Sequence, residues 1–266
     1  VGLRQLVLAE PYRMVRELTD TEVARVRATD QAEDAARLMQ EANLIGLPVV
    51  DSESRLVGLF TIDDAVEIIE AADSEDIARQ AGSSHWTGHY MYAGVLQLAG
   101  ARAVWLLLLI VASSLTVHVL QTFQGALERV TALALFIPLL VGTGGNAGAQ
   151  SATAAVRALA VGELRPSDLP ALLWRECRIG VVLGLMLAAV GFVVGAVTAG
   201  AKVALVGGLA LVVICVWAAI VGAAMPLLAR RAGIDPAVVS APLVATLVDA
   251  TGLIIYFLIA RAVLGL

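Results

Sequence analysis

Residues 236–266 form an apolar segment whose charged side chains are Asp249 and Arg261. Its length, about thirty residues, is enough to cross a bilayer hydrocarbon core roughly 30 Å thick. A carboxylate inside that core costs at least about 2.5 kcal/mol, so it usually faces a water-filled path or a partner. Small residues flank Asp249, which leaves room for a ligand to approach. We therefore predict that Asp249, together with the nearby Ala245, lines the route of a cation.

The composition indicates a membrane protein with a soluble part. Hydrophobic residues make up 59% of the 266 residues, against about 45–50% in soluble domains. Residues 1–101 carry 17 acidic and 8 basic side chains, whereas residues 102–266 carry 6 acidic and 10 basic ones. An acidic soluble part attracts cations and repels nucleic acid. The partners expected from composition are therefore the lipid bilayer and cations, with no nucleic acid.

Residues 102–266 contain five apolar stretches long enough to span a membrane. These predicted spans are 103–124, 130–161, 179–199, 203–228 and 237–264. Seven basic residues fall on one side of this arrangement and three on the other. Basic residues concentrate on the cytoplasmic side. We therefore expect a multi-pass protein of a bacterial cytoplasmic membrane, with the N-terminus in the cytoplasm and the C-terminus outside.

The second span contains glycines and a proline that weaken a helix. They lie in the run 138–150, which includes Thr143, Gly145 and Asn146. Irregular backbone at membrane depth is tolerated where it lines an aqueous cavity, and neutral oxygen donors suit a hard cation. We predict that this span is broken at Pro138 and at Gly142–Gly145, and that Thr143, Gly145 and Asn146 have a role in the pore. Close helix packing through small residues is the alternative.

Two further acidic features precede the spans. Asp235 stands before Pro236 at the start of the fifth span, where it either caps a helix or lines the mouth of the pore. The segment from Asp63 to Asp76 contains seven acidic residues and no basic one. That run is either a solvated helix face or a site for divalent cations, which prefer carboxylate oxygens. The residues assigned to this regulatory metal site are Asp64, Glu67, Glu70, Glu75 and Asp76.

The pattern of residues 23–72 predicts a small α/β unit. Strands are expected at 23–27, 47–50 and 56–60, with one helix capped by Thr29 or Asp30 and another beginning at Thr61. The sequences 47–51 and 58–64 resemble a CBS module. The resemblance implies an adenine nucleotide such as ATP at Thr61 and Asp64, while helix capping explains the same pair.

The predicted domains are the tail of a first CBS module (1–18), a second module (19–62), a connecting helix (63–101) and the pore domain (102–266).

The runs 138–150, 157–163, 222–226, 235–242 and 247–252 together resemble the MgtE family of magnesium channels and transporters. The resemblance covers nearly the whole chain. It implies a polytopic α-helical membrane protein that forms a homodimer around a central pore. It also implies that Asp249 is the main ion-selective carboxylate, and that the cytosolic part closes the pore when it binds Mg²⁺.

Other functions fit the residues less well. A CBS-linked transporter of another divalent or organic cation is the alternative. An enzyme is not expected, because no predicted span carries a Ser–His pair or a Glu-x-x-His motif. His85 and His89 have a metal-type spacing without an evident third ligand, so they, with Trp86, Tyr90 and Tyr92, fit a membrane-interface belt better.

Overall fold

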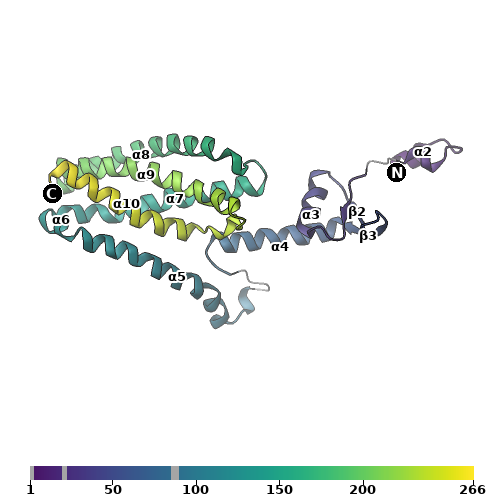
Figure 1. The fold of residues 1–266 in the computed structure, drawn as a ribbon, viewed down its shortest axis with the longest axis horizontal. Helices are drawn as coiled ribbons and strands as arrows, with labels where there is room; N and C mark the ends of the chain where they lie inside the picture. The colour runs from purple at the N-terminus through teal and green to yellow at the C-terminus, as the bar shows by residue number, and fades with distance from the viewer. Residues whose placement is uncertain (1–2, 20–22, 85–89) are drawn as a thin grey trace. The chain divides into compact units, whose positions relative to one another are not determined.

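The computed structural model describes residues 3–19, 23–84 and 90–266 of the chain (Figure 1). His85, Trp86 and His89 lie outside the described residues, so the prediction of an interface belt there stays a prediction. The chain divides into two compact units, Val1–Ser74 and Glu75–Leu266. The division falls within one long helix, and each unit is described by itself below.

The first unit is a small α/β fold. Its elements are α1 (Leu3–Leu8), α2 (Val15–Leu18), β1 (Val26–Arg27), α3 (Ala32–Glu41), β2 (Gly46–Val50), β3 (Leu56–Thr61) and the first part of α4 (Ile62–Gln80). The strands form one sheet in the order β1-β2-β3, with β1 and β2 parallel and β2 and β3 antiparallel. A parallel pair needs a crossover connection, and α3 provides it between β1 and β2.

The core of this unit lies between the sheet and the two helices. Met39 of α3 and Leu47 of β2 are fully buried, and Ala65 of α4 packs in the same cluster. The predicted cap of α3 was wrong, because Gln31 occupies the N-cap position. The carboxylate of Asp30 instead accepts a hydrogen bond from the backbone N–H of Arg27 at 2.8 Å, which closes the turn before the helix.

The second unit is a bundle of long helices. Its elements after α4 are η1 (Tyr90–Tyr92), α5 (Val95–Thr122), α6 (Gln124–Arg129), η2 (Thr131–Phe136), α7 (Ile137–Ala160), η3 (Pro166–Asp168), α8 (Leu169–Ala199), α9 (Ala201–Arg231), η4 (Pro236–Val238) and α10 (Ala241–Leu264). Five stretches of the described residues are long and apolar enough to span a membrane. They correspond to α5, α7, α8, α9 and α10, and two of them include the short helices η2 and η3. This confirms the polytopic α-helical fold class. The first span starts at Val95, earlier than predicted.

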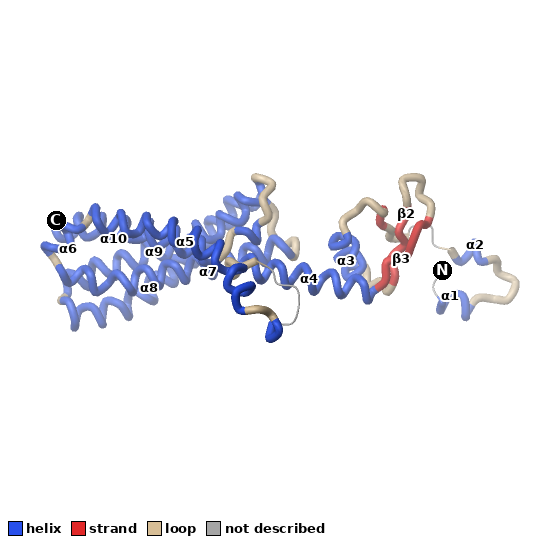
Figure 2. The backbone as a smooth tube through the Cα atoms, turned by 90° about the horizontal axis from the view of Figure 1, so that it is seen from below, coloured by secondary structure: helices blue, strands red, loops and turns tan. Residues whose placement is uncertain are grey.

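Helix α9 lies at the centre of this bundle. In the most apolar 18-residue stretch of α9, 61% of the residues are buried, compared with 11% in the corresponding stretch of α5. The long helices run side by side in both views, and α6 and the C-terminal end of α10 lie at the same end of the bundle (Figure 2). At that end, the rings of Phe123 and Phe257 stack with centroids 4.8 Å apart. The buried hydroxyl of Tyr256 donates to the backbone oxygen of Leu133 at 2.9 Å, which ties α10 to η2.

The predicted break at Gly142–Gly145 was wrong. Helix α7 is continuous through these residues, and Pro138 occupies its first turn, where proline is tolerated. The irregular backbone lies earlier, in the 3₁₀ helix η2. The glycines allow close packing instead: a methyl group at Gly144 would lie 2.7 Å from Ile214 of α9. Contacts with α9 and α10 therefore offset the low intrinsic helix propensity of this run.

Candidate functional site

Asp249 lies within α10 and belongs to a membrane-spanning stretch. It is eight residues from the start of α10 at Ala241, which is about 12 Å along the axis. Among the described residues, its Oδ1 is the one buried side-chain oxygen or nitrogen without a hydrogen-bond partner. Buried polar atoms are nearly always paired, and an exception requires an explanation such as a bound ion or water. The fold thus leaves one buried carboxylate oxygen without a hydrogen-bond partner among the described residues.

Gly145 of α7 lets this carboxylate pack closely against the neighbouring helix. A Cβ atom at position 145 would lie 3.0 Å from Asp249 Oδ1 and 3.3 Å from the Cβ of Ala245. The structure therefore brings Asp249, Ala245 and Gly145 together between α7 and α10. The remaining predicted pore residues, Thr143 and Asn146, lie on α7 within two positions of Gly145. Thr143 is half-buried and Asn146 is exposed.

Helix α7 has a polar stripe that continues from Asn146 toward its C-terminal end. Asn146, Gln150 and Thr153 are all exposed and recur at helical spacing, and Arg157 follows one turn later. These side chains belong to a stretch apolar enough to span a membrane. Polar side chains at membrane depth usually face a bundle interior or a water-filled cavity. In the single chain this stripe is uncovered.

Sequence reasoning missed a second polar contact behind α7. The buried hydroxyl of Ser151 contacts Glu176 Oε2 of α8 and the backbone oxygen of Ala219 in α9, both at 2.8 Å. These contacts join three helices on the side of α7 opposite its polar stripe. Glu176 lies just before the predicted third span at 179–199, so nothing in the sequence placed its carboxylate beside Ser151. This cluster supports the helix that carries Gly145.

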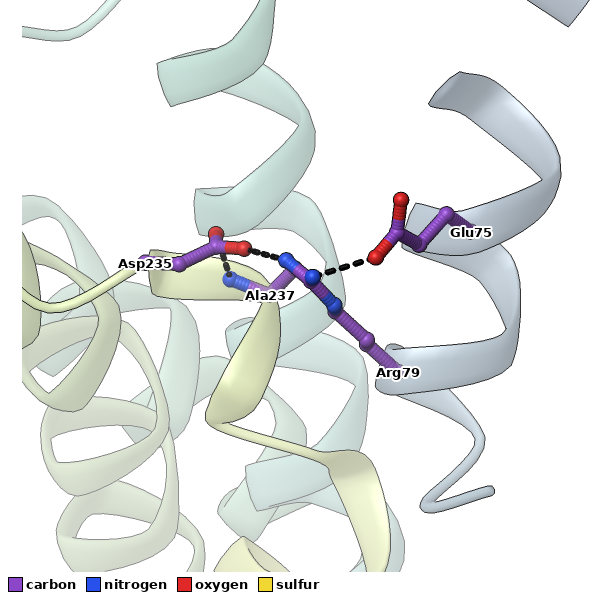
Figure 3. A network of polar contacts seen from close by, with 4 residues as sticks. All are labelled: Glu75, Arg79, Asp235 and Ala237. Carbon is purple, nitrogen blue, oxygen red and sulfur yellow. Dashed lines mark hydrogen bonds and ion pairs between the residues drawn. The ribbon is translucent and has the colours of Figure 1, made fainter. Parts of the chain in front are cut away.

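Asp235 lies outside α10, before the short helix η4. Its Oδ1 accepts a hydrogen bond from the backbone N–H of Ala237 at 2.9 Å, so it caps η4, while Ser240 caps α10. Its Oδ2 pairs with Arg79, whose guanidinium also pairs with Glu75 one turn earlier in α4 (Figure 3). Arg79 is another residue that sequence reasoning missed. The structure therefore does not join Asp235 to the Asp249 cluster but to the end of α4.

A second contact holds the same region together. The indole N–H of Trp105 in α5 donates to the hydroxyl of Ser240 at 3.0 Å. Gly82, which follows α4 with a φ of +70°, packs directly on the Trp105 ring, where a Cβ atom would come within 2.4 Å. The chain that leaves α4 is thus packed against α5 and the first turn of α10.

The acidic run lies on α4. Asp64, Glu67 and Glu70 belong to the first unit and are exposed, whereas Glu75 and Asp76 belong to the second and are half-buried. The Thr61 hydroxyl and the N–H groups at the helix start hold the pKa of the exposed Asp63 below its usual range. No group of three or more His, Cys, Asp or Glu residues suited to a metal ion occurs within the described part of the chain.

The two residues predicted to contact a nucleotide lie together at the start of α4. The Thr61 hydroxyl donates to Asp64 Oδ2 at 2.7 Å. This contact joins two side chains three residues apart, whereas in a capping box each side chain bonds to the backbone N–H of the other residue. Both side chains remain accessible from outside the unit.

Comparison with known proteins agrees with this geometry. Residues 137–259, which hold Gly145 and Asp249, match the MgtE family, described as divalent cation transporter. Residues 15–71 match the CBS domain. The chain belongs to the MgtE family. The chain is 44% identical to the magnesium transporter MgtE of Thermus thermophilus and 31% identical to that of Bacillus subtilis. These matches cover 99% and 98% of the chain, but only 59% and 58% of the relatives.

Proposed function

We propose that this chain transports Mg²⁺ across a bacterial cytoplasmic membrane. The relatives are named magnesium transporters, and the family description is that of a divalent cation transporter. The observation that carries the proposal is the unpartnered carboxylate oxygen of Asp249, buried against Gly145 in a membrane-spanning helix. A bound or passing cation would supply the missing partner. Transport, rather than catalysis, is the function that this site supports.

A hydrated ion held between two copies of the chain fits the donor set. Mg²⁺ releases its waters reluctantly and is usually held by one or two carboxylates. One Asp249 from each copy would hold the ion through those waters. The exposed stripe of Asn146, Gln150 and Thr153 would then line the pore instead of facing lipid. We therefore propose a homodimer with α7 and α10 of each copy at its centre, and a mass measurement of the purified protein tests this.

The test of transport is Mg²⁺ uptake. Purified protein reconstituted into liposomes should carry Mg²⁺ down a concentration gradient, as reported by a Mg²⁺-sensitive dye inside. Liposomes without protein provide the baseline, and Co²⁺ or Ni²⁺ added in competition tests the alternative of another divalent ion. Uptake no faster than in protein-free liposomes contradicts the proposal. Uptake of Co²⁺ in preference to Mg²⁺ favours the alternative.

The charge distribution supports an orientation for the chain. Arg157, Arg175, Arg178, Arg230 and Arg231 lie toward one end of the spans, whereas Arg129, Lys202 and Arg261 lie toward the other. By the preference of basic residues for the cytoplasm, the CBS domain is cytoplasmic and the C-terminal end of α10 is outside. Labelling of a cysteine introduced near residue 264 by an impermeant reagent tests this topology.

We also propose that cytosolic Mg²⁺ slows transport by binding the acidic face of α4. Like charges at helical spacing repel one another by a few tenths of a kcal/mol per pair, and a divalent ion relieves that repulsion. Replacing Glu67, Glu70, Glu75 and Asp76 with their amides should raise the internal Mg²⁺ concentration needed for half-inhibition severalfold. Patch recordings with varied internal Mg²⁺ measure this.

A matched variant controls for total charge in that experiment. It neutralises four acidic side chains elsewhere in the first unit: Glu10, Asp34, Glu41 and Glu53. This control should keep the inhibition of the parent protein. Identical responses of the parent and the α4 variant to internal Mg²⁺ would contradict a sensing role for α4.

Arg79 should restrain ion entry at Asp235. Its guanidinium pairs with the Asp235 carboxylate and so reduces the negative charge offered to an approaching cation (Figure 3). Replacing Arg79 with glutamine should raise the initial rate of Mg²⁺ uptake, by up to about fivefold given the ~0–1 kcal/mol typical of exposed ion pairs. Arg55→Gln, which removes another exposed pair with Glu53, is the control and should leave the rate unchanged. A lower rate in Arg79→Gln refutes this role.

Nucleotide binding at the CBS domain is a separate proposal. Thr61 and Asp64 lie together and accessible at the start of α4, which supports contacts with the ribose or phosphates of ATP. The same hydrogen bond can also serve only to hold the start of α4, without a nucleotide. Calorimetry with ATP on the parent chain and on Asp64→Asn separates the two explanations, because only a nucleotide site gives binding heat that the substitution removes.

A further inference from the structure

A cavity is lined by residues of α6 and of the C-terminal part of α10. These two segments lie at the same end of the second unit (Figure 1). The volume of the cavity is about 380 Å³, within the range of roughly 300–1,000 Å³ typical of ligand pockets. Arg129 of α6 and Arg261 of α10 both line it, although they are distant in the sequence. Residues within 122–129, from the end of α5 through α6, and within 261–266, at the C-terminal end of the chain, together line this cavity.

The two arginines have no protein partner in the described part of the chain. No hydrogen bond or ion pair joins either side chain to another described residue. Glu128, the acidic neighbour of Arg129, instead accepts a hydrogen bond from the side-chain amide of Gln124 at 2.8 Å. Two cationic groups that share one cavity repel each other, and a bound anion removes that repulsion.

The other lining residues suit a phosphate group near a lipid surface. The Thr122 hydroxyl already donates to the backbone oxygen of His118, so the two arginines, and not this hydroxyl, supply the donors for a phosphate. Phe123, Ala126 and Leu266 give the cavity an apolar wall. Arginine side chains bind phosphate through paired, parallel hydrogen bonds. The cavity also lies where the apolar helices end, which is the depth of lipid headgroups.

We propose that Arg129 and Arg261 form a binding site for a phosphate group, carried by an anionic phospholipid or free in solution. The phosphate occupies the space between the two guanidinium groups. For a lipid, the glycerol and first acyl carbons lie along Phe123 and Leu266. This site is independent of the cation route at Asp249, which lies twelve residues before Arg261 in the same helix, about 18 Å along its axis.

Binding to the purified full chain in detergent tests the site. The probes are dioctanoyl-phosphatidylglycerol, inorganic phosphate, and dioctanoylglycerol, which has the same acyl chains without the phosphate. Phosphatidylglycerol should bind and raise the midpoint of thermal unfolding. Arg129→Gln and Arg261→Gln should each weaken that binding about tenfold, since hydrogen bonds to charged groups are the stronger class. Arg261→Lys, which keeps the charge and loses the paired geometry, should weaken it less.

Lys202→Gln is the matched control, because Lys202 is an exposed cation at the start of α9 and does not line the cavity. It should bind the probes like the parent protein. Inorganic phosphate that binds as tightly as phosphatidylglycerol, with the same dependence on both arginines, supports the site and identifies free phosphate as its ligand. Binding that is unchanged in the double arginine variant overturns the proposal. Equal binding of dioctanoylglycerol, or no binding of any probe, also overturns it.

Discussion

Replacing Asp249 with asparagine should abolish Mg²⁺ uptake and leave the protein folded. The carboxylate is the single acidic group of α10, and its Oδ1 has no protein partner to lose. A divalent ion about 5 Å from one charge gains roughly 6–7 kcal/mol at an effective dielectric constant near 20. Losing that attraction in both copies of a dimer should reduce uptake by more than about 100-fold.

The stability of Asp249→Asn separates a pore role from a structural role. Because a buried charge without a partner is costly, the substitution should keep or raise the midpoint of thermal unfolding. Asp235→Asn, which removes a carboxylate paired with Arg79 outside α10, should reduce uptake far less. Uptake by Asp249→Asn at the rate of the parent protein would falsify the assignment of Asp249 to the pore.

Replacing Gly222 with alanine should destabilise the membrane part of the protein. The added methyl group would lie 2.3 Å from the backbone oxygen of Gly148 and 3.1 Å from the Cβ of Ser151. Backbone atoms cannot move aside as a flexible side chain can, so α7 and α9 must separate. Overpacking of this kind costs about 1–3 kcal/mol. We expect a clear fall in the midpoint of thermal unfolding, measured on the detergent-purified protein.

The same substitution should also reduce transport. Gly148 packs against Val248 and Val244 of α10, where a Cβ atom at position 148 would meet them at 3.1 and 3.2 Å. A displaced α7 therefore changes the spacing between Gly145 and Asp249. Gly208→Ala is the control, because Gly208 is a buried residue of α9 whose nearest neighbour to an added Cβ lies 3.8 Å away. That variant should be neutral or slightly more stable, since alanine favours a helix over glycine by about 1 kcal/mol.

Much of the fold was predictable because it depends on local patterns. Apolar length revealed the five spans, and alternating strands and helices revealed the α/β unit. The prediction failed at Gly142–Gly145, where intrinsic propensity indicated a break. Contacts of these glycines with Ile214, Val248 and Ala245 keep the helix regular, and such contacts are not visible in a one-dimensional pattern. The predicted N-cap of α3 was wrong for a similar reason, since the Asp30 carboxylate instead accepts a hydrogen bond from the backbone N–H of Arg27 in the preceding turn.

The candidate site was predictable in part. A lone carboxylate in an apolar segment identified Asp249, because charge at membrane depth is costly whatever the fold. The pairing of Arg79 with Asp235 was not predictable, since 156 residues separate the two in sequence. The hydrogen bond between Ser151 and Glu176 was not predictable either, and neither was the cavity that Arg129 and Arg261 both line.

The sequence by itself determined which segments enter the bilayer, how many there are, and that one of them carries a carboxylate. Those properties follow from transfer free energies, which depend on each segment's own residues. Only the tertiary structure decided that Gly145 packs against the Asp249 carboxylate and that Asp249 Oδ1 has no hydrogen-bond partner among the described residues. Inside lipid, apolar helices gain little from hiding apolar surface from one another. Their mutual placement therefore depends on close contacts such as Gly222 with Gly148, which exist only once the helices are packed.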